Sequence, residues 1–523
     1  MVGFDAVIVG AGHNGLAAAV HLRKRGWSVA VLEAASVAGG AVKTSEVTVA
    51  GFRHDLCAMN LSMFAGSPFF AQYKDELIAH GLELVGAPDC FASIFRDHSY
   101  LGVSTDLDRT VAAINAVSSR DAAAWREMVD RFRADAPHLF ALLGSPMPSI
   151  AALRSVFAAW RQLGSGRLAE LARLLLATPR DFLDANFESP KLKAMMASWG
   201  MHLDFAPDTA GGALFPYLES MAIQSFGMVI GKGGADTMIK AMCGLLRAQG
   251  VEIQLNSTVT SIDVEGGRAS GVRLADGTRI AARRVVIANL HPQLVFGRLV
   301  PPDPERAAFD GRVARIRPGP GTMMVHLALS GPLDWRAGDA LRRFAYVHLA
   351  PDLAMMSRVY AEAASGLLPA EPVLVVGQPT AVDVGRAPAG QQVLWVQVRA
   401  LPAVIAGDAS GTIAVSDWDR AKIPYCERVI DLLERYAPGL RSKILGRAIF
   451  SPLDLERENP SLIDGDNLSG SHHLDQNFVF RPVAGYSRYR TPVERLYLCG
   501  AATWPGAGTG AGSGFMLAKM LAG

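Results

Sequence analysis

The chain has 523 residues, half of them apolar, and a formal net charge of only +2. This length exceeds one ordinary domain, and the apolar content predicts at least two buried cores rather than a disordered protein. A dedicated nucleic-acid-binding function is disfavoured, because phosphate binding requires a dense basic face and the sequence shows none.

The five cysteines are widely separated: Cys57, Cys90, Cys243, Cys426 and Cys499. They form no CxxC pair and no His/Cys cluster with metal-ligand spacing, so we expect no disulfide framework, redox dithiol or metal site. The first residues enter a strand pattern directly, without the apolar core of a signal peptide, and no apolar run reaches the length of a membrane-spanning helix. The sequence therefore predicts a cytoplasmic protein.

The front of the chain has the pattern of a strand, a turn, a helix and a second strand. Residues 5–34 read "DAVIVGAGHNGLAAAVHLRKRGWSVAVLEA". The pattern predicts a buried strand over 6–9, a glycine turn, a helix over 16–25 and a second strand over 29–32. Glu33 directly follows that second strand, close to the offset at which an acid reaches a nucleotide ribose.

The glycines of this turn have separate physical roles. Gly10 permits the turn, Gly12 lets the backbone approach a pyrophosphate, and Gly15 lets the helix pack on the strand, while the helix N-terminus offers N–H groups to negative charge. Glu33 is expected to bind the ribose hydroxyls and to repel a 2′-phosphate. Glycine turns often only connect elements, but here strand, turn, helix, strand and acid agree, which predicts dinucleotide binding.

The middle of the chain predicts a helix over 236–248 and then a run of short strands. The strands are expected at 251–255, 259–264, 269–274, 279–283 and 285–289, with hairpin turns at "EGGR" and "ADGT". Taken by itself, this segment is also typical of an ordinary antiparallel sheet that contacts no ligand.

The chain ends on "ERLYLCGAATWPGAGTGAGSGFMLAKMLAG". We expect a strand over 496–499, a glycine turn and a helix over 513–521. The alternating glycines predict a second place where helix N–H groups meet a ligand without side chains in the way. The alternative, a flexible tail, fits poorly with the apolar helix that follows.

Two further regions are expected to form the substrate side. Residues 50–225 show helical patterns, and residues 300–420 alternate apolar and polar residues as in an antiparallel sheet. Such a sheet, covered by helices and set against the nucleotide-binding part, makes an interdomain cleft for an apolar substrate. Six methionines line this cleft or fill the core: Met195, Met196, Met323, Met324, Met355 and Met356.

One helical pattern within residues 150–187 is both basic and apolar. It carries Arg154, Arg161, Arg167, Arg173 and Arg180 among leucines and aromatic residues. This pattern is compatible with a peripheral contact to an anionic membrane. We favour the plainer interpretation, a helical cap with a solvated face.

Four stretches together resemble a known superfamily. After the first turn and Glu33, "EAASVAGGAVKTSEV" places Gly39 and Gly40 in a second glycine turn, and "GKGGADTMIKAM" and "LYLCGAATWPGAGTGAGSG" follow later. These stretches resemble flavoproteins of the amine-oxidase and phytoene-desaturase superfamily. The region around "ENPSLIDGDNLSGSHHLDQNFVF" is especially similar to the branch named for a pyridine nucleotide-disulphide oxidoreductase domain.

The resemblance implies an α/β fold with two interleaved domains. A Rossmann-like FAD-binding domain of the GR2 type would combine residues 1–60, 225–295 and 485–523. An α+β substrate domain, a helical cap plus an antiparallel sheet, would combine residues 61–224 and 296–484. The chain departs from the pattern in two respects: it lacks the CxxC of a disulphide reductase, and it lacks a second strand-GxGxxG-helix unit for a dedicated NAD(P)H site.

The resemblance also implies FAD as the cofactor and a set of contacts to it. Val259 would clasp the adenine by its backbone, and Gly510 and Ala511 would approach the N1/C2=O edge of the flavin. Ala501 stands where the amine oxidases usually have an acid, so one ribityl hydrogen bond must come from elsewhere. The full implied set is Gly10, Ala11, Gly12, Asn14, Gly15, Glu33, Gly39, Gly40, Ala41, Val259, Ala288, Asn289, Gly500, Ala501, Gly510 and Ala511.

Trp504, His472 and His473 are the candidates on the substrate side. Trp504 precedes the final glycines and is therefore expected near the flavin, where an aromatic ring could orient an apolar substrate or an amine. The alternative for the two histidines is hydrogen bonding to Asp475 or to the backbone.

These features predict an FAD-dependent oxidoreductase that oxidises a C–C or C–N single bond of an apolar small molecule by hydride transfer to flavin N5, with reoxidation by oxygen or a quinone. A flavin-dependent double-bond isomerase or saturase would share every motif. A non-catalytic flavin-binding interaction protein and a Rossmann-type NAD dehydrogenase are two more competing functions. The sequence leaves the oligomeric state open.

Overall fold

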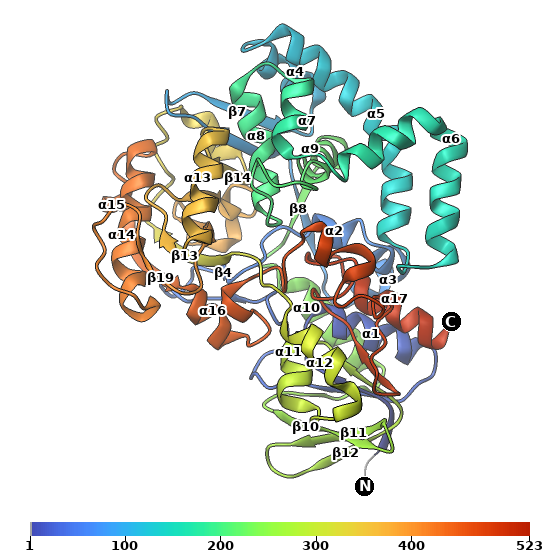
Figure 1. Ribbon diagram of the computed structural model, residues 1–523. Helices are drawn as coiled ribbons and strands as arrows, with labels where there is room; N and C mark the ends of the chain where they lie inside the picture. Colours follow the sequence, from blue (N-terminus) through green and yellow to red (C-terminus); the bar gives the residue numbers. More distant parts are fainter. Residues whose placement is uncertain (1–2) are drawn as a thin grey trace.

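The computed structural model describes residues 3–523, and its strands are organised around two seven-stranded sheets in different parts of the molecule (Figure 1). The first sheet has the order β10-β11-β12-β1-β2-β9, with β20 pairing β12. Its strands are β1 (Gly3–Val9), β2 (Val29–Leu32), β9 (Ile253–Gln254), β10 (Val259–Glu265), β11 (Arg268–Leu274), β12 (Arg279–Ala288) and β20 (Leu496–Leu498).

Parallel pairing joins distant parts of the chain in this sheet. β1 pairs in parallel with both β2 and β12, and β12 pairs in parallel with β20. The first residues of β12 pair antiparallel with β11, whereas its last residues, Val286 to Ala288, pair with β20. β12 is thus one long strand where the sequence predicted two, because it passes from the hairpin sheet into the parallel sheet without a break.

Three helices pack around the front strands. They are α1 (His13–Lys24), α10 (Thr237–Ala248) and α17 (Gly512–Ala522). α1 is buried from Asn14 to Leu22, because it packs against both α10 and α17 as well as against the sheet. The first and the last helices of the chain therefore lie side by side (Figure 1).

The predicted elements of this part are confirmed, with ends that differ by a few residues. The strand over 29–32 matches β2, and the helix predicted over 236–248 begins at Thr237 with Asp236 as its N-cap. The strand predicted over 251–255 shrinks to the two residues of β9. The C-terminal helix begins at Gly512, one residue earlier than predicted.

The second sheet has the order β19-β13-β17-β16-β14-β6-β7 and is antiparallel except between β14 and β6. Its strands are β6 (Asp89–Ile94), β7 (Tyr100–Ser104), β13 (Gly321–Leu329), β14 (Tyr346–Leu349), β16 (Val373–Gly377), β17 (Gln392–Leu401) and β19 (Ile444–Phe450). The antiparallel sheet predicted over 300–420 is thus present, and it extends to both sides of that range.

The polar residues of the two central strands do not form a solvent-exposed face. Every residue of β13 and β17 is buried, including the polar His326, Gln397 and Arg399. Helices α13 (Leu353–Ala364) and α14 (Trp418–Tyr436) lie in this part of the molecule (Figure 1), and the residues of α14 share a core with β13 and β17. His326 packs against the rings of His54 and Phe450, whereas Gln397 and Arg399 line an internal cavity.

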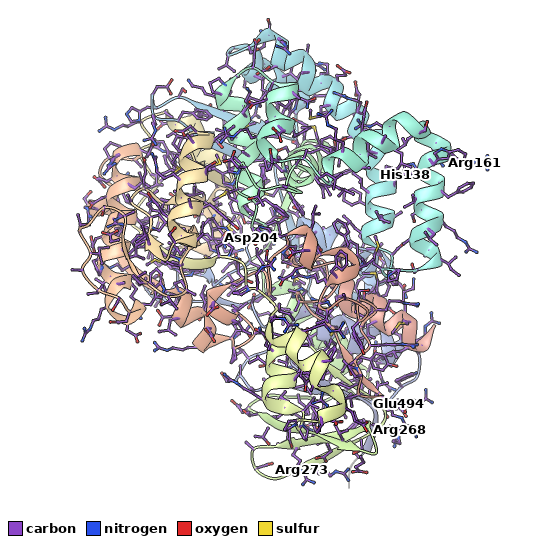
Figure 2. All side chains as sticks on the ribbon, viewed as in Figure 1. His138, Arg161, Asp204, Arg268, Arg273 and Glu494 are labelled. Atoms are coloured by element: carbon purple, nitrogen blue, oxygen red, sulfur yellow. The ribbon has the colours of Figure 1, made fainter. Side chains whose placement is uncertain are left out.

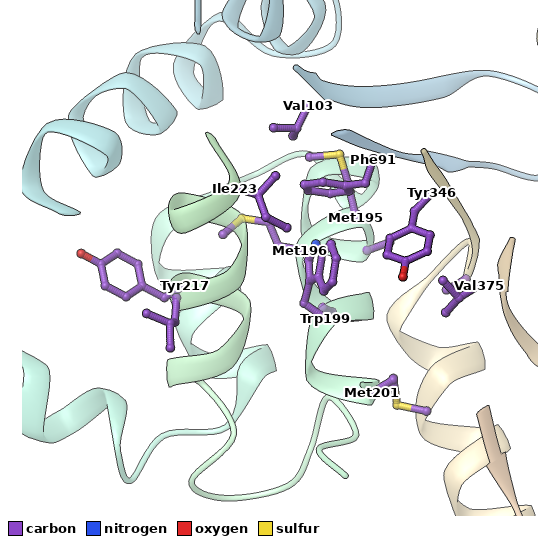
Figure 3. Packing of buried hydrophobic residues seen from close by; sticks show 14 of the residues in the cluster. Phe91, Val103, Met195, Met196, Trp199, Met201, Tyr217, Ile223, Tyr346 and Val375 are labelled. Atoms are coloured by element: carbon purple, nitrogen blue, oxygen red, sulfur yellow. The ribbon is translucent and has the colours of Figure 1, made fainter. Parts of the chain in front are cut away.

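A helical region completes the molecule. It contains α5 (Ser119–Leu143), α6 (Ile150–Leu174), α8 (Pro190–Met201) and α9 (Leu214–Phe226). α8 is buried along most of its length, and Met195 and Met196 pack there with Phe91 and Ile223 (Figure 3). Of the two interpretations of the six methionines, the core is the one that holds, because all six are at most 1% exposed and none lines the main cavity.

α6 differs from an ordinary core-facing amphipathic helix. It pairs with α5 at the outer edge of the molecule, and Arg161 projects outward (Figures 1 and 2). Its outer face carries apolar side chains as well: Ile150, Leu153, Phe157 and Trp160 are 70%, 71%, 57% and 49% exposed. The expected solvated polar face is therefore partly apolar. Over residues 3–523, no helix combines the length and the apolar character that a membrane span requires.

Candidate functional site

The first glycine turn sits between β1 and α1 and leaves the helix N-terminus open. Gly12 is the N-cap of α1 in an extended conformation, without a side-chain cap and without an acid in the first turn. The first N–H groups of a helix have no intrahelical acceptor, so those of α1 are available to an external anion. Gly15 admits no side chain, since a Cβ would lie 2.4 Å from the carbonyl oxygen of Gly10.

Glu33 is held in place by backbone N–H groups. Its Oε2 accepts a hydrogen bond from Ala11 N–H at 2.7 Å, and its Oε1 accepts one from Ala35 N–H at 2.9 Å. These bonds tie the end of β2 to the glycine turn and fix the carboxylate at the wall of the cavity. Each oxygen keeps capacity for a further donor such as a ribose hydroxyl.

The second glycine turn and the C-terminal turn meet the first one. Gly12 forms a parallel bridge with Gly39, and Gly39 N–H donates to Ala11 C=O at 3.0 Å. Asn289, after β12, lies between Gly12 and Gly500: a Cβ on either glycine would come within 2.9 Å of the Asn289 side chain. The first and the last glycine turns thus present bare backbone to one side chain, and the second turn joins them through Gly12.

These turns open into one large cavity of about 840 Å³. This volume is at the upper end of the range for small-molecule and cofactor sites. Thirteen of the sequence-predicted residues line it: Gly10, Gly12, Asn14, Glu33, Gly39, Gly40, Ala41, Val259, Asn289, His472, Gly500, Ala501 and Trp504.

Six of the predicted residues do not line the cavity. Ala11, Gly15 and Ala288 lie behind the wall, where they form the strand ends and the turn. Gly510 faces the backbone of Met63, and Ala511 is the left-handed N-cap of α17. The sixth is His473. The residues that line the cavity near the last turn are instead Trp504, Pro505, Ala507, Gly508 and Thr509.

The side chains of Trp504 and the two histidines form hydrogen bonds with backbone groups of the protein. The Trp504 indole N–H donates to Ser145 C=O at 2.8 Å, which anchors the ring in the core. His472 Nε2 accepts a hydrogen bond from Ala507 N–H at 3.1 Å and so holds the last glycine segment. His473 Nε2 donates to Asp204 C=O at 2.9 Å, away from the cavity.

The predicted backbone alternative therefore describes the hydrogen bonds of both histidines. Asp475, the other partner considered, forms an ion pair with Arg317 instead. Burial and the nearby Arg481 guanidinium lower the pKa of His472 far below its usual range, so this imidazole is neutral.

Arg481 is a functional candidate that sequence reasoning missed. It is 2% exposed, and its guanidinium donates to backbone carbonyls, including Ala501 C=O at 2.8 Å. Burial lowers its pKa to about 10, so it is a cation at neutral pH. It fixes the position of Ala501 and supplies positive potential beside the last glycine turn.

The far wall of the cavity consists of aromatic and aliphatic side chains. Trp199 and Tyr346 lie close together there (Figure 3), and Trp199 makes an edge contact with His348 at 5.1 Å. Other members of this wall are Leu203, Leu214, Phe215, Leu218, Trp395 and Gln397. Sequence reasoning missed these residues, because their patterns are those of ordinary core strands and helices.

His202 presents a hydrogen-bond acceptor to this wall. The Ser198 hydroxyl donates to Met195 C=O at 2.7 Å, so its oxygen accepts from His348 Nδ1–H at 2.9 Å. His348 Nε2 then accepts from His202 Nε2–H at 3.2 Å, which leaves the lone pair on His202 Nδ1. Burial lowers the pKa of both imidazoles, to about 3 for His348, so the pair is neutral.

Two classes of site lack support in the part of the chain that the structure describes. All five cysteines are unpaired, and burial raises the pKa of the Cys57 thiol to about 12. Between residues 3 and 523 no group of three or more His, Cys, Asp or Glu side chains has the arrangement of a metal site.

A family model described as flavin containing amine oxidoreductase matches residues 15–450 of the chain. The chain belongs to this family. Its cofactor is therefore FAD, and it is an FAD-dependent oxidoreductase.

Two relatives and one solved structure illustrate the family. The protein named pyridine nucleotide-disulfide oxidoreductase domain-containing protein 2 of Rattus norvegicus is 30% identical, covering 97% of this chain and 91% of its own length. A neurosporene-forming phytoene desaturase of Cereibacter sphaeroides is 25% identical, covering 98% and 94%. A triple mutant of putrescine oxidase has a TM-score of 0.62 at 17% identity, covering 100% and 98%. The fold and the superfamily resemblance are thus confirmed.

The residues of the cavity fit FAD. The bare backbone around Asn289, where added Cβ atoms would clash, and the uncapped N-terminus of α1 together suit a pyrophosphate. In this cavity Glu33 would hold a ribose, and the segment from Gly500 to Thr509 would hold the flavin end. FAD supplies two-electron chemistry when bound, and the chain supplies binding, orientation and exclusion of water.

Proposed function

We propose that this FAD-dependent oxidoreductase oxidises a C–C or C–N single bond of a largely apolar small molecule to a double bond, by hydride transfer to flavin N5. The observation that supports the proposal is the continuity of the cavity, which joins the three glycine turns to a wall of aromatic and aliphatic side chains. An apolar substrate bound at that wall lies in the same space as the flavin end of the cofactor.

The far wall determines what the chain contributes to such a reaction. Trp199, Phe215, Tyr346 and Trp395 offer large rigid surfaces that orient an apolar molecule and exclude water. One relative is named a phytoene desaturase, and because desaturation forms a C–C double bond, this likeness favours a C–C bond as the one oxidised. Oxygen or a quinone is proposed as the acceptor that reoxidises the flavin.

A flavin-dependent double-bond isomerase or saturase is the main competing function, since it needs the same cofactor and the same apolar wall. A non-catalytic flavin-binding interaction protein is the second. The NAD dehydrogenase considered from the sequence is disfavoured, because the family that includes this chain is flavin-containing.

Absorption spectroscopy of the purified protein, followed by an anaerobic substrate screen, tests the proposal. We expect an oxidised flavin spectrum that bleaches when phytoene, limonene, an acyl thioester or benzylamine is added without oxygen, and that recovers on admission of oxygen or a soluble quinone. Product formation without bleaching would instead identify an isomerase. A protein that binds FAD but is reduced by no member of the panel would contradict the proposal.

A further inference from the structure

One carboxyl group in the cavity wall has no partner. Three glutamates line the cavity, and two of them are engaged: Glu33 accepts two backbone N–H groups, and Glu458 forms an ion pair with Lys43 at 2.7 Å. Glu219 also lines the cavity but forms neither a hydrogen bond nor an ion pair with any residue of the range 3–523. It is therefore the one acid of this wall that the described protein leaves uncommitted.

Glu219 stands on an apolar face of α9. Leu214, Phe215 and Leu218 line the cavity from the same helix, so the carboxyl group projects from an apolar stripe into the same space. Desolvation raises the pKa of Glu219 to about 7, and no neighbouring charge contributes to that shift. The titratable or charged groups that line the cavity elsewhere are His13, Glu33, Lys43, Cys57, His202, His291, Arg298, Tyr346, Arg399, Arg457, Glu458 and His472.

Nearby acids show that the fold satisfies carboxylates where they are structural. Asp135 on α5 binds the Arg167 guanidinium and the Tyr217 hydroxyl, and Tyr217 lies on the same helix as Glu219. Asp121, at the start of α5, accepts two backbone N–H groups. Glu219 is partly exposed to the cavity and has no such partner, so its carboxyl group is available to a bound molecule.

Arg399, which also lines the cavity, is not free to neutralise this acid. Its guanidinium donates to Met201 C=O, His202 C=O, Thr322 Oγ1 and Asn467 Oδ1, which uses its N–H groups on the protein. Arg399 therefore has no N–H group left to form an ion pair with Glu219.

We propose that Glu219 accepts the proton that leaves the substrate when its new double bond forms. This inference rests on the proposed function. Formation of the double bond breaks two bonds to hydrogen on adjacent atoms. One hydrogen leaves as a hydride, whose electron pair reduces the flavin, and the other leaves as a proton that forms an O–H bond with the Glu219 carboxylate. The electron pair left behind becomes the π bond.

The ionisation of Glu219 suits this role. At neutral pH the carboxylate and the carboxylic acid are both populated, which is the condition under which a general base works best. His202 Nδ1 is another basic atom in this wall, but burial makes its imidazolium unfavourable. Glu219 is thus the better final holder of the proton.

The first test measures the ionisation directly and needs no substrate. Infrared spectroscopy of the FAD-bound protein in D₂O between pD 5 and 9 should show a protonated-carboxyl band that titrates near neutrality. The band should be absent from Glu219→Gln and present in Glu83→Gln, a matched control in which an exposed glutamate paired with Lys232 is changed. Burial also raises the pKa values of Asp204 and Asp466, so the decisive signal is the difference between wild type and Glu219→Gln. A neutral titration of undiminished amplitude in Glu219→Gln, or the lack of any neutral titration in the wild type, would overturn the proposal.

The second test measures flavin reduction by the compound that bleaches the wild-type protein. Glu219→Gln should keep its FAD and its affinity for the compound but lose a factor of about 100 or more in the limiting rate of reduction. Glu219→Asp should regain part of that rate, and Glu83→Gln should match the wild type. Equal rates in Glu219→Gln and the wild type would overturn the role of Glu219 while the proposed function stands. If no compound bleaches the flavin of the wild-type protein, the proposed function fails. The proton-acceptor role rests on that function and then fails with it. In that case the infrared experiment measures only the ionisation of Glu219.

Discussion

Replacement of Gly514 by alanine tests whether the two ends of the chain must touch to hold the cofactor. Gly514 lies in α17 where it crosses α1, and a Cβ there would lie 1.8 Å from the carbonyl oxygen of Asn14. A Cβ atom keeps about 3.0 Å from its neighbours, so the two helices would have to separate by about 1.2 Å. Both sides of the contact are backbone, so no rotamer change relieves it. We expect a loss near the upper end of overpacking effects, about 3 kcal/mol.

The same displacement reaches the cofactor site. It moves the N-terminus of α1 and breaks the hydrogen bond from Gly514 N–H to Asn14 Oδ1. We expect Gly514→Ala to purify with little FAD and to unfold at a lower temperature, as measured by flavin absorbance and by circular dichroism. Gly512→Ala is the matched control on the same helix, because its Cβ would lie 3.5 Å from the nearest atom, an ordinary contact. If Gly514→Ala retains FAD and stability equal to Gly512→Ala, the inferred close contact is wrong.

Three more perturbations test contacts elsewhere in the molecule. Glu33→Gln removes a charged acceptor of the Ala11 and Ala35 N–H groups. The dissociation constant of FAD, measured by fluorescence titration, should therefore rise about tenfold or more. An unchanged constant would contradict the role assigned to Glu33. Burial holds the pKa of His348 at about 3, below its unfolded value, so the unfolded state binds more protons below about pH 6.5. The free energy of unfolding should therefore fall on acidification from pH 6.5 to 5, by less in His348→Gln, and equal urea profiles for both proteins would refute the inference. Because α6 exposes an apolar face, the protein should cosediment with vesicles that contain phosphatidylglycerol but not with vesicles of pure phosphatidylcholine. Changing Leu153 and Phe157 to serine should abolish this binding. If the wild-type protein does not sediment with either kind of vesicle, α6 is a solvated cap.

The cofactor half of the fold could be predicted from the sequence because its determinants are local. Gly12, Gly39 and Gly500 mark places where a side chain has no room, and this requirement is visible in the residue type itself. The strands next to them are short apolar runs with turn residues at both ends, so their existence was predictable. Their pairing was not: β12 changes neighbours from β11 to β20 within one strand, which only the tertiary structure determines.

The final glycines show the limit of reading one residue type. The sequence analysis explained their alternation by one bound ligand, but their constraints differ. Gly514 allows two helices to cross, Gly506 makes room for His472, and Gly508 makes room for Met63. Only Gly508 of these three also lines the cavity. A glycine indicates that another group lies close to the backbone. Which group that is depends on the tertiary structure, because the neighbour can be hundreds of residues away in the sequence.

The part of the molecule that forms the far wall of the cavity was less predictable for a different physical reason. Its wall consists of side chains on one face of α8, α9, β14 and β17, and the other faces of those elements belong to the core. An apolar helix with a single acid, as in Leu214–Phe226, has the same sequence pattern whether the acid reaches solvent, an arginine or a substrate. Asp135 and Glu219 illustrate this, because both are acids on helices of the same bundle and only one is paired. Glu219 differs from Asp135 because it lies in the cavity wall and has no partner in the described part of the chain, and both are properties of the assembled fold rather than of any stretch of sequence.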